Sequence, residues 1–406
     1  MNIFQKYGRL FLLAAGAGAI FQIPYIRETF YIPTRDAMDL TNAQMGWLSG
    51  GYSIVATVSY FFGGVLADKI SPRKVLSYSF LSTGILGLWL STFPNFLIAL
   101  LIYCLMGIST IITWSATVKA TRLLGNSDEQ GKLFGWQEGL RGIATASLVF
   151  LMTYVYSLFS NEILGTSWAI RICAIVVIII GVLNFIFLKE TSTSAESEPI
   201  SKVLKGLFKV LLIPKVWLLI AMVFFAYSLY GIIGYINTFA ISVYKLSVEG
   251  GSTLGGARYL VQAAGGILGG IIADRLHSRT KVIFISSLAL TLSFVLFLTL
   301  PSNYVLLWIV ISNFIFALFF IYVIRSQYFA IIDDLGFSQS LTGRVSGVVS
   351  CFGYMPDMFM FTMIGSWLDR FSGKDGFNLM FIYAIVMCIG CVLISYILHR
   401  MTKINF

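Results

Sequence analysis

Charge and histidine are scarce in this sequence of 406 residues. Asp, Glu, Lys and Arg together make up only 11% of it, and there are two histidines, whereas a soluble domain carries about 25% charged residues. Because 58% of the residues are hydrophobic, a soluble fold could not hide that much apolar surface from water. The composition therefore excludes a lone soluble enzyme, and it also excludes disorder, collagen and a coiled coil.

Reactive and metal-binding groups are equally few. The five cysteines all lie in apolar runs, and Cys388 and Cys391, although spaced like a redox pair, are expected to pack as apolar side chains. His277 and His399 cannot build a zinc site by themselves. The sequence also has no nucleotide-binding loop, nucleophile motif or metal cluster. We therefore expect no cofactor, no metal, no enzymatic activity, no ATP drive and no nucleic-acid partner.

Long apolar segments dominate the chain instead. Segments of 18 or more residues, each long enough to cross a bilayer, recur throughout the sequence. The twelve predicted spans cover approximately residues 8–32, 45–67, 74–93, 95–118, 133–159, 168–188, 215–243, 253–273, 281–300, 303–325, 343–367 and 377–399. The sequence thus predicts an all-α integral membrane protein with twelve transmembrane helices.

Basic residues are distributed unevenly between the predicted loops. Of the 28 Lys and Arg residues, twenty fall on the side of the N-terminus, four fall in loops on the other side, and four lie within or at the edge of spans. The four in the other loops are Arg35, Lys245, Arg370 and Lys374, and the four at spans are Arg27, Arg141, Arg171 and Arg258. Because cytoplasmic loops carry the excess of positive charge, both termini are predicted to be cytoplasmic.

One polar segment divides the spans six and six. Residues 189–214 separate an N-terminal six-helix bundle, 1–188, from a C-terminal six-helix bundle, 215–406. Three lysines of this segment share one helical face, and apolar residues form another. A basic amphipathic helix on the inner leaflet is therefore predicted within the linker.

The two halves share a loop motif. The first copy begins at Gly63 and reads GGVLADKISPRK, and the second begins at Gly269 and reads GGIIADRLHSRTK. Two glycines, Ala-Asp-Lys/Arg and an Arg five residues beyond the Asp would rarely coincide by chance. The aspartates, Asp68 and Asp274, are 206 residues apart, which is about half the chain. The sequence therefore contains an internal repeat.

On these residues the chain resembles the major facilitator superfamily of transporters over nearly its whole length. The family loop pattern, G-x-L-A-D-R-x-G-R-R/K, is matched by Gly64, Leu66, Ala67, Asp68, Lys69 and Arg73. The central glycine of the pattern is replaced by Ser71 and, in the second copy, by His277. The resemblance implies two pseudo-symmetric six-helix bundles with a solute site near the bilayer midplane.

The motif is expected to act in conformational switching. The carboxylate of Asp68, at the inner end of a helix, can meet Arg73, Lys74 or the N-terminus of a neighbouring helix. Contacts that form in one state and break in the other bias alternating access. The gating residues predicted from the two copies are Gly64, Asp68, Arg73, Gly270, Asp274 and Arg279. The alternative is that these charges only set topology.

Span one carries Arg27 within the segment PYIRETF. Eighteen residues separate Arg27 from Arg9, about 27 Å along a helix, so it lies in the outer half of the span. Its R-x-x-F pattern resembles organophosphate:phosphate antiporters, which bind phosphate with a span-one arginine and a second arginine in span seven. Here span seven offers tyrosines and an asparagine instead. The substrate-binding residues predicted in these two spans are Tyr25, Arg27, Tyr230 and Asn237. The alternative for Arg27 is an interfacial position beside Glu28 or Asp36.

Charges also occur in spans five and eight. Glu138 and Arg141 are three residues apart and can pair on one helical face. Arg258 could approach Glu138, because the resemblance implies that spans five and eight meet, or it could line the substrate route. We predict that Arg141 and Arg258 bind substrate and that Glu138 can carry protons. The alternatives are a structural ion pair and a snorkelling arginine.

Span eleven carries Asp357 directly after Pro356. Asp357 is 13 residues beyond Arg344 and 12 before Asp369, so it lies deep in the span. A carboxyl there can bind a proton, and the proline opens the helix backbone beside it. We predict proton coupling through Asp357; the alternative is a fixed partner for an arginine. Arg325, at the inner end of span ten, is expected first to set topology and second to line an electropositive vestibule.

The arginines inside the spans outnumber the deep acids, which favours an anionic solute. We predict a secondary active transporter of a small organic anion, such as a sugar acid, a sulfonate or a phosphorylated compound, working by alternating access with proton coupling or exchange. The alternatives are a proton-driven multidrug exporter of hydrophobic compounds and a transporter-like sensor. The resemblance further implies a monomer in the lipid of a bacterial inner membrane, with protons as possible partners.

Overall fold

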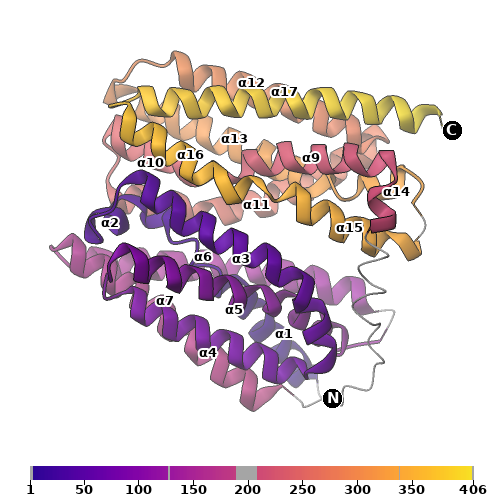
Figure 1. Cartoon of the computed structure of the whole chain (residues 1–406), viewed down its shortest axis with the longest axis horizontal. Coiled ribbons are helices and arrows are strands. Elements are labelled where there is room, and N and C mark those ends of the chain that lie inside the picture. Colours follow the sequence, from indigo (N-terminus) through magenta and orange to yellow (C-terminus); the bar gives the residue numbers. More distant parts are fainter. Residues whose placement is uncertain (1–2, 127–128, 189–207, 338, 405–406) are drawn as a thin grey trace. The chain divides into compact units, whose positions relative to one another are not determined.

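Helices make up almost all of the described chain. The computed structural model describes residues 3–126, 129–188, 208–337 and 339–404, and no strand occurs within these ranges (Figure 1). The side chains of residues 3, 60–69, 115, 130–132, 333, 339–343 and 402–404 are outside the described set. Most of the predicted linker and its amphipathic helix also lies outside the described residues.

The chain divides into two compact units. Unit 1 comprises Met1–Ser197 and Ser247–Leu260, and unit 2 comprises Glu198–Leu246 and Val261–Phe406. The helices of unit 1 are α1 (Ile3–Ala19), α2 (Arg27–Ala37), α3 (Asn42–Lys69), α4 (Pro72–Leu90), α5 (Phe96–Arg122), α6 (Gln130–Ser157) and α7 (Glu162–Phe187). Those of unit 2 are α9 (Pro214–Gly231), α10 (Ile233–Tyr244), α12 (Arg279–Thr299), η2 (Tyr304–Leu306), α13 (Leu307–Gln327), α14 (Ile331–Asp334), α15 (Gln339–Gly353), α16 (Pro356–Arg370) and α17 (Asp375–Ile404). One helix, α11 (Val248–Leu276), contributes its first part to unit 1 and the rest to unit 2.

Three of the predicted spans are interrupted helices. Span 8–32 consists of α1 and α2, span 215–243 of α9 and α10, and span 343–367 of α15 and α16. α16 begins at Pro356, which lacks the backbone N–H that a continuous helix would use. In α2 the backbone of Phe30 is non-helical, with φ −124° and ψ 44°. These breaks place polar side chains at helix ends inside the units.

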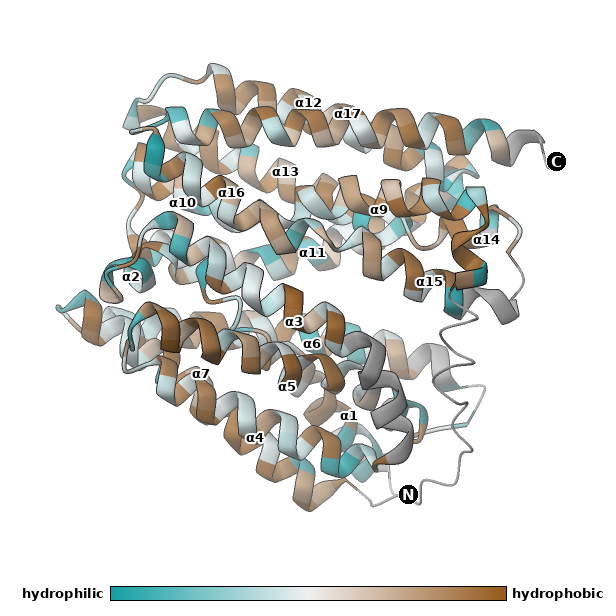
Figure 2. Cartoon of the chain, viewed as in Figure 1, coloured by the Kyte–Doolittle hydropathy of each residue, from teal (hydrophilic) through white to brown (hydrophobic). Residues whose placement is uncertain are grey.

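Large apolar side chains are exposed on both units. Trp308, Leu292 and Leu97 are exposed by 75%, 72% and 72%, and Figure 2 shows apolar residues along nearly every helix. Eight helical stretches in the described part of the chain are long and apolar enough to cross a membrane. Lipid accommodates such a surface, and helices satisfy their backbone hydrogen bonds internally, as a membrane requires.

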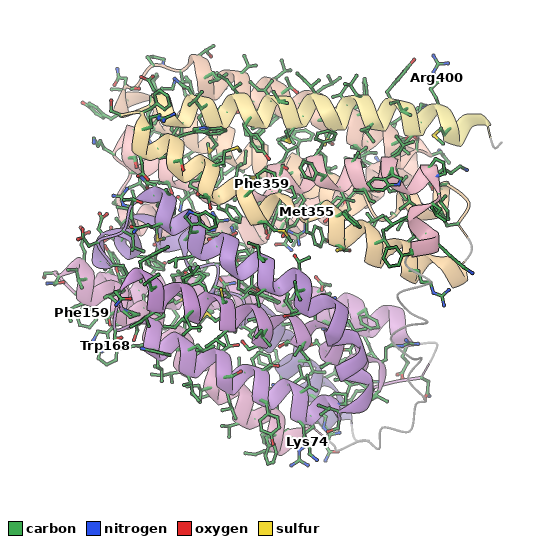
Figure 3. All side chains as sticks on the ribbon, viewed as in Figure 1. Lys74, Phe159, Trp168, Met355, Phe359 and Arg400 are labelled. Carbon is green, nitrogen blue, oxygen red and sulfur yellow. The ribbon has the colours of Figure 1, made fainter. Side chains whose placement is uncertain are left out.

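The two ends of unit 1 carry different residue types. At one end Phe159 and Trp168 stack with ring centroids 6.2 Å apart, and the guanidinium of Arg171 lies 5.2 Å from the Trp168 ring. Lys74 lies at the opposite end of the unit (Figure 3). Aromatic residues are typical of both membrane interfaces, and lysines are typical of cytoplasmic loops.

Two glycines allow the close helix contacts that position polar side chains. A Cβ on Gly107 of α5 would lie 2.7 Å from the carbonyl oxygen of Tyr52 in α3. A Cβ on Gly231, at the end of α9, would overlap Met360 and lie 3.3 Å from Asp357 Oδ1. Because membrane helices approach most closely at small residues, these glycines bring Tyr52 and Asp357 against their neighbouring helices.

Candidate functional site

The buried charges of unit 1 gather where α2 begins. Arg27 and Glu28 lie in the first turn of α2 and are 2% and 4% exposed, and Arg258 of α11 is 3% exposed. Arg258 Nη2 donates to Glu28 Oε2 and, at 2.7 Å, to the hydroxyl of Tyr259. The attraction between Arg258 and Glu28 offsets the cost of burying each charge.

Gln22 extends this network to the connection between α1 and α2. Its Nε2 donates to the Tyr259 hydroxyl at 3.1 Å and to the carbonyl oxygen of Gly18 at 3.2 Å. The guanidinium of Arg258 also lies 4.7 Å from the centroid of the Tyr259 ring. Polar contacts therefore join the start of α11 to a segment 237 residues earlier in the chain.

Aromatic residues from α3 and α5 accompany Arg27 and Tyr25. Tyr103 of α5 is 1% exposed and is buried in the same unit as Arg27. Tyr25 packs edge-on against Tyr52 of α3, with ring centroids 5.5 Å apart. The hydroxyls of Tyr52 and Thr110 are 2.8 Å apart. Guanidinium and hydroxyl groups of this kind can hold the oxygens of an anion.

The ion pairs of spans five and eight differ from the expected set. Arg258 pairs with Glu28 and not with Glu138, and its burial is not that of a snorkelling side chain. Glu138, whose side chain is 51% exposed, pairs with Arg141 at 2.6 Å. Glu138 and Arg141 are three residues apart on one helix, so helix geometry alone makes them neighbours. The Glu138 carboxylate therefore pairs with Arg141.

Burial bears on the interfacial alternative for Arg27. Asp36, one of its two candidate acids, accepts from Arg35 at 2.7 Å. Arg27 itself is 2% exposed. Its guanidinium therefore lies inside unit 1, where a ligand oxyanion can match its charge and its planar shape.

The predicted proton site lies against tyrosines in unit 2. Asp357, in the first turn of α16, is 4% exposed and accepts a hydrogen bond from the Tyr227 hydroxyl at 3.0 Å. Tyr227 also packs against Tyr354 and Tyr230, with ring centroids 4.2 and 5.6 Å away. Asn237, beyond the break at the end of α9, is 3% exposed. A phenol can donate to an ionised carboxylate or accept from a protonated one, so the contact suits a carboxyl that binds a proton.

Arg325 belongs to the same cluster, although the sequence suggested a topogenic role first. Its Cζ atom lies 3.9 Å from the centroid of the Tyr230 ring, and Tyr230 packs against Tyr322 at 6.1 Å. The spacing Tyr322-x-x-Arg325 puts both side chains on one helical face, and that spacing is the signal that could have identified the site. We define the unit-2 aromatic cluster as Tyr227, Tyr230, Tyr322, Arg325, Tyr354 and Asp357.

The first copy of the loop motif is described only in part. Gly64 and Asp68 belong to the last turns of α3, and their side chains lie outside the described residues. Arg73 Nε donates to the carbonyl oxygen of Phe185 at 2.6 Å, and its guanidinium lies 4.4 Å from the Phe185 ring. Arg73 therefore binds the C-terminal end of α7, where a cation is favourable to the helix dipole.

In the second copy, the arginine pairs outside its own loop. Arg279 Nη1 donates to Asp334 Oδ1 and to the carbonyl oxygen of Ala330, both at 2.7 Å. Asp274 is exposed, and it shares a pocket of about 570 Å³ with Arg279 and Asp334. A Cβ on Gly270 would meet no described atom within 4 Å. The short helix α14 therefore holds the acidic partner of Arg279.

The family follows from comparison with known proteins. The family model described as Major Facilitator Superfamily matches residues 8–355, which is most of the chain. The chain belongs to the major facilitator superfamily.

Two inner membrane proteins of Escherichia coli (strain K12) are similar to this superfamily member over almost its full length. YqcE is 29% identical over 401 residues, covering 97% of this chain and 94% of that protein. YihN is 30% identical over 411 residues, covering 98% and 97%. The present protein is accordingly a multi-pass inner-membrane protein.

Solved structures share the fold. A bacterial homolog of the human lysosomal transporter Spinster, in an inward-facing and unoccupied conformation, aligns with a TM-score of 0.79 at 14% identity, covering 99% of this chain and 98% of that one. The nucleoside transporter NupG aligns with a TM-score of 0.76 at 13% identity, covering 99% and 100%. The predicted all-α major facilitator fold is confirmed, and the family indicates a transporter rather than an enzyme.

Proposed function

We propose that this superfamily member is a secondary active transporter that moves a small organic anion across the inner membrane by alternating access. The observation that carries the proposal is the burial of Arg27 in span one, where its side chain is only 2% exposed. A buried guanidinium is costly in a membrane protein. Its planar fork matches a carboxylate, phosphate or sulfonate, which can accept two hydrogen bonds from it.

The sign of the buried charge in unit 1 supports an anionic solute. Among the described residues of this unit, the fully buried charged side chains are Arg27, Glu28 and Arg258. Glu28 pairs with Arg258, so the three formal charges sum to a positive value. A positive interior attracts anions and repels cations.

We further propose that Asp357 couples transport to protons. Its carboxyl is buried and bonded to the Tyr227 hydroxyl at 3.0 Å. The group can alternate between a charged and a neutral form, and each form changes the local charge that the solute meets. Glu138 is the weaker candidate, because its side chain is 51% exposed and bonded to Arg141. If Asp357 did not carry a proton, the transporter would exchange one solute for another.

The unit-2 aromatic cluster supports a second candidate function. Tyrosine rings beside a carboxylate can hold a hydrophobic cation, as a proton-driven exporter of hydrophobic compounds would require. Arg325, 3.9 Å from the Tyr230 ring, opposes this because it repels a cation in the same place. The sign of the bound solute therefore separates the two functions.

Thermal unfolding of the purified protein tests that sign. The probes are anions with neutral partners of the same carbon skeleton: D-gluconate with sorbitol, glycerol 3-phosphate with glycerol, and isethionate with ethylene glycol. Tetraphenylphosphonium serves as a hydrophobic cation. A bound solute raises the unfolding temperature according to its occupancy. Stabilisation by an anion beyond its neutral partner, at equal ionic strength, supports the proposal; stabilisation by tetraphenylphosphonium alone contradicts it and favours the exporter.

A further inference from the structure

The guanidinium of Arg325 lies half-buried in the last turn of α13. Its Cζ is 3.9 Å from the centroid of the Tyr230 ring. Its Nη1 atom is fully buried and has no hydrogen-bond partner in the described part of the chain. A buried cationic donor without an acceptor destabilises a fold. A ligand that supplied an acceptor to Nη1 would offset this cost.

The Tyr230 ring contacts the face of the guanidinium and offers no acceptor to its N–H groups. A ring below a guanidinium attracts the positive charge through the face of the group. The N–H edge of the same group is then left for hydrogen bonding in the plane. That edge is the part of an arginine that binds a carboxylate or phosphate with two parallel hydrogen bonds. The fold therefore orients Arg325, and among the described residues no acceptor meets Nη1 of that edge.

The residues around Arg325 indicate what else the ligand carries. The Tyr230 ring under its guanidinium packs against Tyr227 and Tyr322, with ring centroids 5.6 and 6.1 Å away, and Tyr354 packs against Tyr227 at 4.2 Å. Each tyrosine offers an apolar ring face together with one hydroxyl. Ring faces pack against C–H groups, and phenol hydroxyls bond to alcohols, so the lining suits a carbon chain that bears hydroxyl groups.

We propose that Arg325 is a second anion-binding residue and that the unit-2 aromatic cluster binds a hydroxylated carboxylate or phosphate through it. Arg325 holds the oxyanion, and the tyrosines hold the hydroxylated carbon chain. Tyr230 is a positioning residue, because it fixes the plane of the guanidinium. This inference rests on the proposed function and narrows the class of its solute.

Apparent dissociation constants of variants of the full chain, obtained from thermal unfolding, test the inference. The probes are D-gluconate and glycerol 3-phosphate, with sorbitol and glycerol as neutral references, so that the two arms distinguish a carboxylate from a phosphate. Arg325→Gln is expected to weaken binding of the stabilising probe at least about tenfold, because it removes charged hydrogen bonds. Arg325→Lys is expected to weaken it by about three- to tenfold, because it keeps the charge but loses the planar fork.

Arg171→Gln is the matched control. Arg171 also lies over an aromatic ring, 5.2 Å from Trp168, but at the end of unit 1. The control should bind the same probe within about twofold of the wild type, since it removes a similar cation–π contact away from the cluster.

The outcomes separate this inference from the proposed function. Unchanged binding in Arg325→Gln, together with lost binding in Arg27→Gln, overturns the role of Arg325 and leaves the organic-anion function standing. A wild type stabilised by isethionate, a sulfonate, but by neither the carboxylate probe nor the phosphate probe does the same. A wild type that no anion stabilises overturns the proposed function and with it this inference. If Arg325→Gln does not fold, Tyr230→Leu takes its place. Binding of the probe about tenfold weaker than in the wild type supports the proposed site. Unchanged binding of the probe in both Tyr230→Leu and Arg325→Lys overturns the proposed site.

Discussion

The two units of the molecule meet the charge of an internal arginine in different ways. In unit 1 Arg258 faces the carboxylate of Glu28, and the two side chains are only 3% and 4% exposed. In unit 2 Arg325 lies over the Tyr230 ring, and its Nη1 has no hydrogen-bond partner among the described residues. An ion pair satisfies both charges within the fold, whereas a ring leaves the N–H edge open. The two arginines therefore differ in their nearest neighbour, which is a carboxylate for Arg258 and an aromatic ring for Arg325.

The largest expected effect comes from breaking the ion pair of unit 1. Glu28→Gln leaves Arg258 buried without a counter-charge and should lower the free energy of unfolding by about 3–5 kcal/mol. Glu138→Gln removes a carboxylate that is 51% exposed, and should cost only about 0–1 kcal/mol. Unfolding midpoints of the two purified variants make the comparison. Equal midpoints would show that burial does not distinguish the two pairs.

Arg27 tests whether the remaining buried cation of unit 1 binds the solute. Arg27→Gln should weaken binding of a stabilising anion about 100-fold, and Arg27→Lys about tenfold, because lysine keeps the charge and loses the fork. Calorimetry or thermal shift with that anion gives both values, and membrane expression should stay normal. Unchanged affinity in Arg27→Gln would sink the organic-anion hypothesis.

Asp357 tests the coupling that unit 2 is proposed to provide. Asp357→Asn should abolish accumulation against a gradient but preserve solute exchange, because Asn resembles the neutral carboxyl in shape. Affinity should change by less than about tenfold, since the Tyr227 hydroxyl keeps a hydrogen-bond partner. Uptake into proteoliposomes with and without a pH gradient measures both activities. If the variant still accumulates solute, another group or none carries the proton.

The smallest effect on affinity is expected at the loop motif. Asp274→Asn should slow transport and leave the dissociation constant within about threefold, because a change in the switching equilibrium acts at a distance from the solute. Asp334→Asn is the matched variant, because it breaks the pair with Arg279 in the same pocket. Normal turnover in Asp68→Asn, Asp274→Asn and their double variant would remove the gating role of the aspartates. If only Asp334→Asn slows transport, the gating role belongs to the ion pair of Arg279 and Asp334.

Local features of this protein could be predicted from its sequence. Apolar runs long enough for a bilayer identify the helices, because in lipid only helices and closed barrels satisfy the backbone. The break at the start of α16 follows from Pro356, which has no N–H to donate. The pair of Glu138 and Arg141 follows from their spacing on one helix.

The contacts of Arg258 and Arg325 could not be predicted in the same way. Glu28 and Arg258 are 230 residues apart, and their meeting depends on how α2 and α11 pack. The family resemblance favoured Glu138 as the partner, although the local bond to Arg141 already occupies that carboxylate. Arg325 lies at the helix end where the sequence placed it, but its contact with Tyr230 could not be predicted, because that ring comes from α9.

The separation of Glu28 and Arg258 also has a consequence for biosynthesis. A ribosome adds about 5–20 residues per second, so the 230 residues between the two correspond to roughly 12 to 46 s of elongation. Throughout that interval the nascent first span has to carry Glu28 without its final counter-charge. Until Arg258 reaches the membrane, the Glu28 carboxylate has to stay at the water interface or use a temporary partner. The contact between Glu28 and Arg258 can therefore form only after the first 258 residues of the chain have been made.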